Sequence, residues 1–244
     1  MNPSTYKDWG VETSGKEDTM FSPYLKVPFL LAKEAGEIPG DLEFAGTWSR
    51  ITEQGDATYL NIVYNLGRDA TDVHDLTRAE MEGRKQAMWA ANALKKYTPG
   101  FENAFLRSFG SSLGIRESRK IIGRYNLTEK DVRNQGRFDD AIGIFPEFLD
   151  GCGIVILPTT GRYFQVPYGI MVPQKVENLL VAGRCVAGDR ISHSATRQMM
   201  CCTVTGQAAG VAAALSIKEK NHSSQVDIAS LQTALSKQGV RIKR

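Results

Sequence analysis

The sequence predicts an α/β protein, in which helices alternate with short strands along one chain. Three observations near its C-terminal end support this prediction. The apolar run Leu179–Ala182 stops at Gly183-Arg184, as a buried strand does. A polar loop follows at 189–197. An uncharged stretch rich in alanine and glycine, 199–217, then has the composition of a helix packed closely inside protein. The order of strand, polar loop and small-residue helix is typical of a sheet edge that faces a ligand.

In the first half of the chain, the sequence predicts a short helix, then a strand, and then one long helix. Residues 1–40 are irregular apart from a short apolar helix around Phe29–Lys33. Residues Thr58–Asn65 are rich in β-branched and aromatic side chains and predict a strand. A long helix then begins after Asp75 or Thr77, either of which can cap it, and Pro99-Gly100 ends it near Lys96.

The second half predicts shorter elements. Residues 103–112 suit a strand or a short helix equally well. Thr128 is a good N-cap for a short helix. Residues 151–158 and 164–168 read as strands paired with each other, and 227–238 as a small helix before a basic tail. The domains are expected at 1–150, 151–220 and 221–244.

Composition disfavours several classes of protein. The net charge of the chain is only +3, and the basic residues are not interleaved with aromatic ones, which argues against nucleic-acid binding. Three histidines and four cysteines show no metal-binding spacing. Adjacent Cys201 and Cys202 lie in an apolar run and predict buried thiols in a reducing compartment. No secretory signal is evident, so the cytoplasm is the default location, with an organelle as the alternative. The stretch 199–217 is poor in leucine and phenylalanine, and we do not expect it to span a membrane.

The small residues after Thr205 suggest a cofactor site. If a helix opens at Gly206-Gln207-Ala208, its free N–H groups and partial positive charge can face the ring of a flavin, which becomes negative on reduction. Gly183-Arg184 would close the same site from the end of the preceding strand. The alternative, equally weighted on spacing alone, is that these small residues only permit close packing of helix on sheet.

Two groups of polar residues suggest a substrate site. Arg116 and Arg119 share a face if their segment is helical, and would hold a carboxylate or phosphate, or form a structural ion pair. His193 and Arg197 are expected in the loop before the small-residue helix. There His193 could move a proton and Arg197 could hold oxygens of substrate or cofactor, although a loop histidine equally often hydrogen-bonds backbone.

Several of these segments, taken in order, resemble the C-terminal half of the FAD-dependent oxidoreductases that are labelled fumarate reductase-like or xanthan lyase-like. The similar blocks are 75–84, 97–103, 114–119 with 123–128, 166–168 and 178–215. The resemblance implies an FAD cofactor and a fold of the FAD/NAD(P)-binding superfamily. In that family a complete chain begins with a glycine-rich Rossmann unit, then a substrate domain, and then returns to complete the FAD site.

The resemblance also assigns roles to residues. Gly183, Arg184, Gly206, Gln207 and Ala208 match flavin-proximal positions. Catalytic positions are matched by Arg116, Arg119, His193 and Arg197, which would orient a small organic substrate while hydride passes to flavin N5. The family's usual loop after Asp140 is replaced here by Gly143–Asp150.

No strand–GxGxxG–helix unit for the ADP half of FAD occurs in the 244 residues. We therefore expect this chain to be one half of such an enzyme, as a subunit of a hetero-oligomer or as a fragment, with the ADP-binding half supplied by another chain or truncated from this sequence. The alternative is a non-catalytic scaffold subunit derived from such a flavoenzyme.

Overall fold

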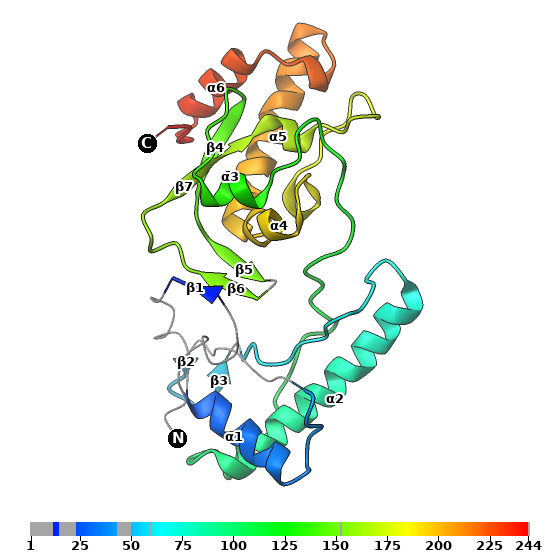
Figure 1. Cartoon of the computed structure of the whole chain (residues 1–244), viewed down its shortest axis with the longest axis vertical. Coiled ribbons are helices and arrows are strands. Elements are labelled where there is room, and N and C mark those ends of the chain that lie inside the picture. Colours follow the sequence, from blue (N-terminus) through cyan, green and yellow to red (C-terminus); the bar gives the residue numbers. More distant parts are fainter. Residues whose placement is uncertain (1–11, 15–22, 43–49, 59, 152, 244) are drawn as a thin grey trace. The chain divides into compact units, whose positions relative to one another are not determined.

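The structure, a computed structural model, describes residues 12–14, 23–42, 50–58, 60–151 and 153–243 (Figure 1). These residues form two compact units, divided between Ser118 and Arg119, with 12–14 belonging to the second. Both units mix helices with short strands, as the sequence predicts.

The described residues of the first unit form two packed helices and a short hairpin. Helix α1 (Pro23–Glu34) packs on α2 (Val73–Tyr97), while β2 (Arg50–Ile51) pairs antiparallel with β3 (Ala57–Thr58). The expected apolar helix is therefore confirmed and begins earlier than expected. A small core holds the helices together, formed by Phe29, Ala32, Ile38, Ile62, Ala90, Ala93 and Leu94.

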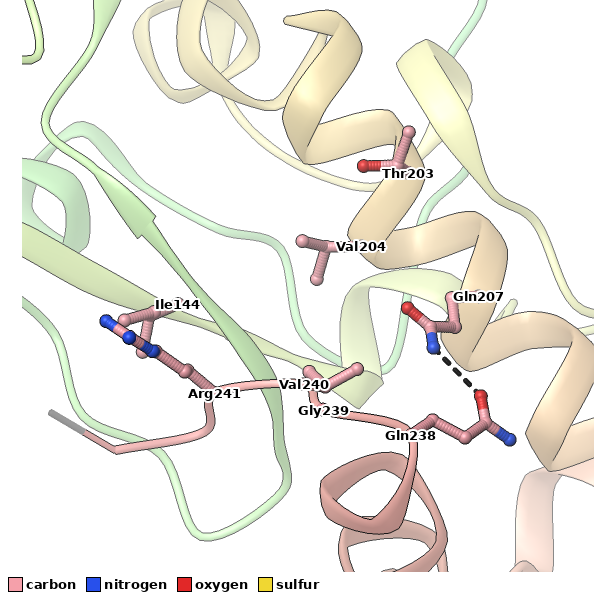
Figure 2. Close-up of a pocket in the computed structure, with 8 residues that line it drawn as sticks. All are labelled: Ile144, Thr203, Val204, Gln207, Gln238, Gly239, Val240 and Arg241. Carbon is pink, nitrogen blue, oxygen red and sulfur yellow. Dashed lines mark hydrogen bonds between the residues drawn. The ribbon is translucent and has the colours of Figure 1, made fainter.

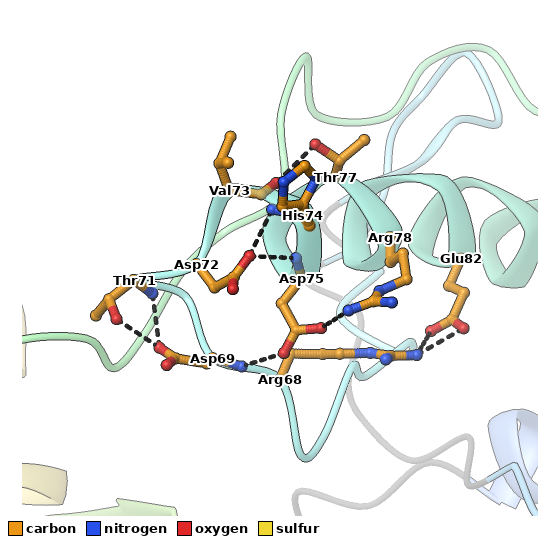
Figure 3. Close-up of polar contacts among 10 residues, drawn as sticks. All are labelled: Arg68, Asp69, Thr71, Asp72, Val73, His74, Asp75, Thr77, Arg78 and Glu82. Atoms are coloured by element: carbon orange, nitrogen blue, oxygen red, sulfur yellow. Dashed lines mark hydrogen bonds and ion pairs between the residues drawn. The ribbon is translucent and has the colours of Figure 1, made fainter.

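The start of α2 differs from the prediction. Its N-cap is Asp72, whose Oδ1 accepts hydrogen bonds from the backbone N–H groups of His74 at 2.7 Å and Asp75 at 3.2 Å (Figure 3). Thr77 lies inside the helix, and its hydroxyl donates to the carbonyl of Val73. Asp72 serves as the cap because its backbone is extended and its carboxylate reaches the first free N–H groups. The prediction that Asp75 or Thr77 caps this helix is therefore wrong, and the cap lies about one turn earlier in the chain.

One further prediction for this unit is wrong, and one choice that the sequence left open is now decided. Among the described residues of the strand expected at Thr58–Asn65, only Thr58 belongs to a strand, β3. Residues 60–65 carry a single bridge residue at Asn61, and only Ile62 among them is buried. β-Branched side chains favour a strand only where a partner strand exists, and none runs along 60–65 in the described part of the chain. Residues 103–112 form neither strand nor helix.

The second unit contains two small sheets. Strand β4 (Ala141–Pro146) pairs antiparallel with β7 (Tyr163–Pro167). The other sheet has the order β1-β6-β5, with β1 (Glu12–Thr13) parallel to β6 (Ile154–Ile156) and β5 (Leu149–Gly151) antiparallel to it. Both strands predicted at 151–158 and 164–168 exist, but their predicted pairing with each other is wrong. Each instead pairs with a strand on its N-terminal side: β6 pairs with β5, its neighbour along the chain, and β7 pairs with β4, from which β5 and β6 separate it in sequence.

Helices cover the β4–β7 sheet. Helix α5 (Met199–Glu219) and helix α6 (Ile228–Lys237) both pack on β4 and on each other (Figure 1). Phe145 and Phe164 pair across the sheet with ring centroids 6.0 Å apart, in a core that includes Leu231 and Leu235 of α6. α6 lies where it was predicted, after its N-cap Asp227.

Shorter helices complete this unit. The predicted N-cap Thr128 is confirmed: it opens α3 (Glu129–Arg133) through a capping box with Asp131. Helix α4 (Arg190–Thr196) and the 3-10 turns η3 (Tyr168–Met171), η4 (Gly183–Cys185) and η5 (Ser223–Gln225) connect the remaining segments. η4 and α5 carry the residues that the sequence suggested for a cofactor site, and α4 carries His193, which it suggested for a substrate site.

Candidate functional site

The segment that leads into the candidate site is not the strand that was predicted. Residues 179–182 lie outside every strand of the described chain, and one hydrogen bond, from Val181 N to Met171 O at 2.9 Å, fixes their course. The four side chains are only partly covered, Leu179 being 44% exposed. An apolar run forms a central strand only with neighbours on both sides, and here the run goes directly into η4.

Gly183 begins η4 with its backbone in the left-handed region, at φ +80°. A glycine is favoured there, because an L-residue with a Cβ is strained at this angle. Its N–H donates to Oγ1 of Thr205 at 2.9 Å, and the Thr205 hydroxyl donates in turn to the carbonyl of Cys202 at 3.0 Å. This chain of hydrogen bonds fastens η4 to α5. A Cβ at Gly183 would meet nothing within 4 Å, so this side of the backbone is open.

The predicted helix start at Gly206-Gln207-Ala208 is wrong. Helix α5 begins at Met199, so these residues lie inside it, where backbone N–H groups are taken up by the helix itself. The helix extends to Met199 because nothing between Met199 and Gly206 interrupts it, and Gln198 supplies the extended residue before it. The argument from a helix dipole at Gly206 therefore does not hold for this chain.

The three residues have different surroundings. Ala208 is fully buried in the core, whereas Gly206 is exposed, with nothing within 4 Å of a Cβ placed there. Gln207 points toward the C-terminal segment, where its Nε2 donates to Oε1 of Gln238 at 2.8 Å (Figure 2). Both glutamines line a shallow cavity of about 230 Å³ together with Ile144, Thr203, Val204, Gly239, Val240 and Arg241. Of the three, only Gly206 combines exposure with an open backbone.

His193 lies in helix α4 and not in the expected loop. Asp189 caps this helix, with its Oδ1 accepting from Ser192 N at 2.7 Å, and its Oδ2 also accepts from Glu129 N at 2.7 Å. The sequence Asp189-Arg-Ile-Ser192 therefore reads as a cap followed by a first turn, a signal that the polar-loop prediction overlooked. His193 is only 3% exposed. A proton shuttle at this position would need a route through the surrounding protein.

Arg197 forms the C-cap of α4, and its side chain is 12% exposed. Its Nη2 donates to the backbone carbonyl of Asp150 and lies 3.4 Å from Oδ2 of the same residue. The cation thus ties α4 to β5, and part of its hydrogen-bonding capacity is used inside the protein. Asp150 was not singled out from the sequence as its partner, and no local pattern points to a contact across 47 positions.

Arg116 and Arg119 do not share a helix face. Residues 115–122 form no helix or strand, so the spacing argument for this pair is wrong. Arg116 belongs to the first compact unit and Arg119 to the second. Within the second unit, Arg119 lies outside helix α4, which contains His193 and ends before its C-cap Arg197.

The thiols of α5 are not poised for chemistry. Burial raises the pKa of the Cys201 thiol well above its ordinary value, and burial followed by the nearby Cys185 raises that of Cys202. Both stay protonated at neutral pH and act as small apolar residues. Among the described residues no group of three or more His, Cys, Asp or Glu side chains has the arrangement of a metal site.

Comparison with known proteins places the chain in a family. The family model described as "FAD dependent oxidoreductase" matches residues 7–235. The chain therefore belongs to the FAD-dependent oxidoreductases, and this membership indicates an FAD cofactor and flavin-linked redox function. No curated protein and no solved structure matches it.

The residues around η4 and α5 fit a flat cofactor in part. Gly183 and Gly206 both present backbone with open space at the Cβ position. Thr205 links them, because it directly precedes Gly206 and its hydroxyl oxygen accepts from Gly183 N. Arg184, which directly follows Gly183, is exposed and basic. An exposed cation beside open backbone suits the polar edge of a flavin. Ala208 can contribute only by packing beneath this surface.

Proposed function

We propose that this chain is the flavin-proximal half of an FAD-dependent oxidoreductase, which moves hydride between a small organic substrate and flavin N5. The observation that carries the proposal is the open backbone of Gly183 and Gly206, joined through Thr205, in a chain that belongs to this family. FAD, when bound, supplies the acceptor for hydride taken from a CH–OH, CH–CH or CH–NH carbon.

The chain's own residues would bind and orient. Gly183 and Gly206 would let the ring approach, and the guanidinium of Arg184 would attract negative charge near it. On the substrate side, the exposed Arg119 of the second unit would attract an anionic group. Arg197, already anchored on Asp150, would supply a fixed positive charge, and His193 would hold a proton that reaches it only through the protein interior.

A second chain would supply the ADP-binding half. The support is that α5 leaves an apolar face uncovered, with Met199 84%, Met200 57% and Ile217 79% exposed. Its length and composition would let α5 cross a bilayer, with 28% of that stretch buried, a test that core helices of globular proteins also pass. We assign this face to protein because glycine and alanine, which permit close backbone approach, are common along it.

The alternative proposal is a scaffold subunit without catalysis. It is favoured by the burial of His193 and by the attachment of Arg197 to Asp150, since both residues then have structural roles that need no substrate.

The test is the visible absorbance spectrum of the chain purified from its native source, with every co-eluting protein identified by mass. A flavin spectrum together with a partner that carries a glycine-rich Rossmann motif supports the two-chain oxidoreductase. Arg184→Gln should then lower the bound flavin, whereas Lys175→Gln, which removes another exposed charge, should not. A folded, colourless chain without such a partner would leave the scaffold.

A further inference from the structure

A second cavity, of about 300 Å³, lies in the second unit and contains none of the residues proposed for the flavin or its substrate. Its volume is at the lower end of the range for small-molecule sites, roughly 300–1,000 Å³. It lies between the segment before α3, the start of β4, η3 and the chain that joins η5 to α6. The lining residues are Arg124, Tyr125, Asp140, Tyr168, Gly169, Val172, Ser224, Val226 and Ile228.

One wall of this cavity is apolar and firmly held. Val172, Val226 and Ile228 present aliphatic side chains. Tyr168 is 4% exposed, and its hydroxyl donates to the carbonyl of Ser223 at 2.6 Å, which fixes the ring against the segment before α6. An aliphatic group of a ligand would gain free energy by leaving water for this wall.

Two opposite charges line the same cavity. Oδ2 of Asp140 accepts from Gly169 N at 2.8 Å, and this is the one hydrogen bond of its carboxylate in the described part of the chain. The guanidinium of Arg124 donates from Nη1 to the carbonyl of Ser224, and it makes no ion pair with any residue in the described part of the chain. Each charge therefore keeps hydrogen-bonding capacity for a ligand, and the two are not paired with each other within 4.0 Å.

The presence of both a positive and a negative charge in the lining decides which class of ligand fits the cavity. A simple anion would be attracted by Arg124 and repelled by Asp140, and a simple cation would meet the reverse. A zwitterion satisfies both, with a carboxylate on the guanidinium and an ammonium on the carboxylate. The phenols of Tyr125 and Tyr168 do not alter this balance, because a phenol is already neutral at physiological pH and burial raises the pKa of each further, to about 12.

We propose that this cavity binds a free α-amino acid with an aliphatic side chain. Asp140 receives the ammonium group, Arg124 the carboxylate, and Val172, Val226 and Ile228 the side chain. This site is separate from the proposed flavin site, and the chain can bind the amino acid without FAD.

Isothermal titration calorimetry of the full chain with L-leucine tests the proposal. Binding is expected, and N-acetyl-leucine, which lacks the ammonium, and leucinamide, which lacks the carboxylate, should each bind roughly 10- to 100-fold more weakly, the loss of one charged hydrogen bond. Absence of L-leucine binding, or equal binding of the three compounds, would overturn the proposal.

Two variants test whether Arg124 and Asp140 bind the charged groups of the amino acid. Arg124→Gln and Asp140→Asn should each weaken L-leucine by the same factor, while Lys175→Gln, outside the cavity, should leave it unchanged. The asparagine keeps an oxygen to accept from Gly169 N. If Asp140→Asn fails to fold, the Arg124 variant decides alone, and unchanged leucine affinity there would contradict the assignment. Because the readout needs no flavin, failure here is distinct from failure of the proposed function.

Discussion

The two longest helices of the chain, α2 with 25 residues and α5 with 21, are built in opposite ways. α2 is capped by Asp72, carries charged side chains along its length and buries one face against α1. α5 has no side-chain cap, carries no charge before Lys218 and buries a stripe of small residues, including Cys201, Ala208 and Ala212.

The difference teaches where each helix gets its stability. α2 is supported by its own sequence, through its cap and through surface ion pairs such as Arg84–Glu80 four residues apart. α5 depends on tertiary packing, because its residues neither cap nor pair with one another along the helix. Its uncovered apolar face is consistent with the further chain that we propose to pack there.

The largest effect expected is a difference between two neighbouring positions of α5. Ala212 is fully buried and Ala213 is exposed. Ala212→Glu places an unpaired charge in the core and should lower the free energy of unfolding by about 3–5 kcal/mol. Ala213→Glu should change it by less than about 0.5 kcal/mol.

Thermal and urea denaturation, followed by circular dichroism, measure both variants. On the proposed function, Ala213→Glu should also weaken association with the second chain while leaving the isolated chain folded. Equal destabilisation by the two variants would mean that α5 is buried all round, and the contrast with α2 would disappear.

The next effect concerns the contact between α5 and β4. A Cβ at Gly143 would lie 2.7 Å from Cγ1 of Val204, which is too close for either atom to stay in place. Gly143→Ala should therefore destabilise the chain by about 1–3 kcal/mol. Val204→Ala removes the obstructing methyl groups, so the double variant should recover part of that loss, giving a coupling free energy of about 0.5–3 kcal/mol.

Gly210→Ala provides the matched control on the exposed side of the same helix. Nothing lies within 4 Å of a Cβ at that position, so alanine should stabilise the helix by about 0.5–1 kcal/mol. Urea denaturation reports all four variants. Additive losses for Gly143→Ala and Val204→Ala would contradict the close approach of helix and strand.

How far the sequence predicted this structure depends on whether a signal was local. The N-cap at Thr128 and the small helix at 227–238 were predicted from signals within a few residues of each helix, and both predictions are confirmed. The strands at 154–156 and 163–167 were also predicted from local composition. Their pairing partners were not, because register depends on segments that no local pattern specifies.

The candidate site shows the same limit. The apolar run was expected to stop at Gly183, and the chain does turn there, with Gly183 at φ +80°. The surroundings of Gly206, His193 and Arg197 were mispredicted, since helix α5 begins a full two turns before Gly206 and α4 replaces the loop. Whether an arginine contacts Asp150 or a substrate depends on long-range packing, and that information is not present in spacing.

Helix caps offer a smaller test of the comparison. Asp72→Ala should destabilise the first unit by about 1 kcal/mol, because it leaves N–H groups of α2 without their acceptor. Gln198 has the extended backbone of an N-cap but makes no capping hydrogen bond, so Gln198→Asp should stabilise α5 by about 0.5 kcal/mol.

Denaturation curves of the two variants, compared with the parent chain, measure these changes. The gain at Gln198 is expected to be the smaller, because the substitution also removes the hydrogen bond from Gln198 Nε2 to Ser194 O at 2.9 Å. An effect at Gln198 with no effect at Asp72 would reverse the contrast between the helices.

The smallest expected effect is a difference in pH dependence. The backbone N–H of Asp69, and then the guanidinium of Arg78, hold the pKa of the Asp75 carboxyl below its ordinary value. A lowered pKa in the folded state contributes stability that is present above the unfolded pKa and is lost as pH falls through the folded one. α5 has no carboxylate before Glu219 and should show no such loss of its own.

Amide hydrogen exchange between pH 6 and pH 3, corrected for the intrinsic exchange rate, compares the helices within one molecule. Protection of the first turn of α2 should decrease as pH falls below about 4, while that of α5 should not follow the same curve. Asp75→Asn, whose amide oxygen can still accept from Asp69 N, should flatten the α2 profile. Parallel profiles for both helices in the parent chain would show that acid acts on the whole chain and not through the charged start of α2.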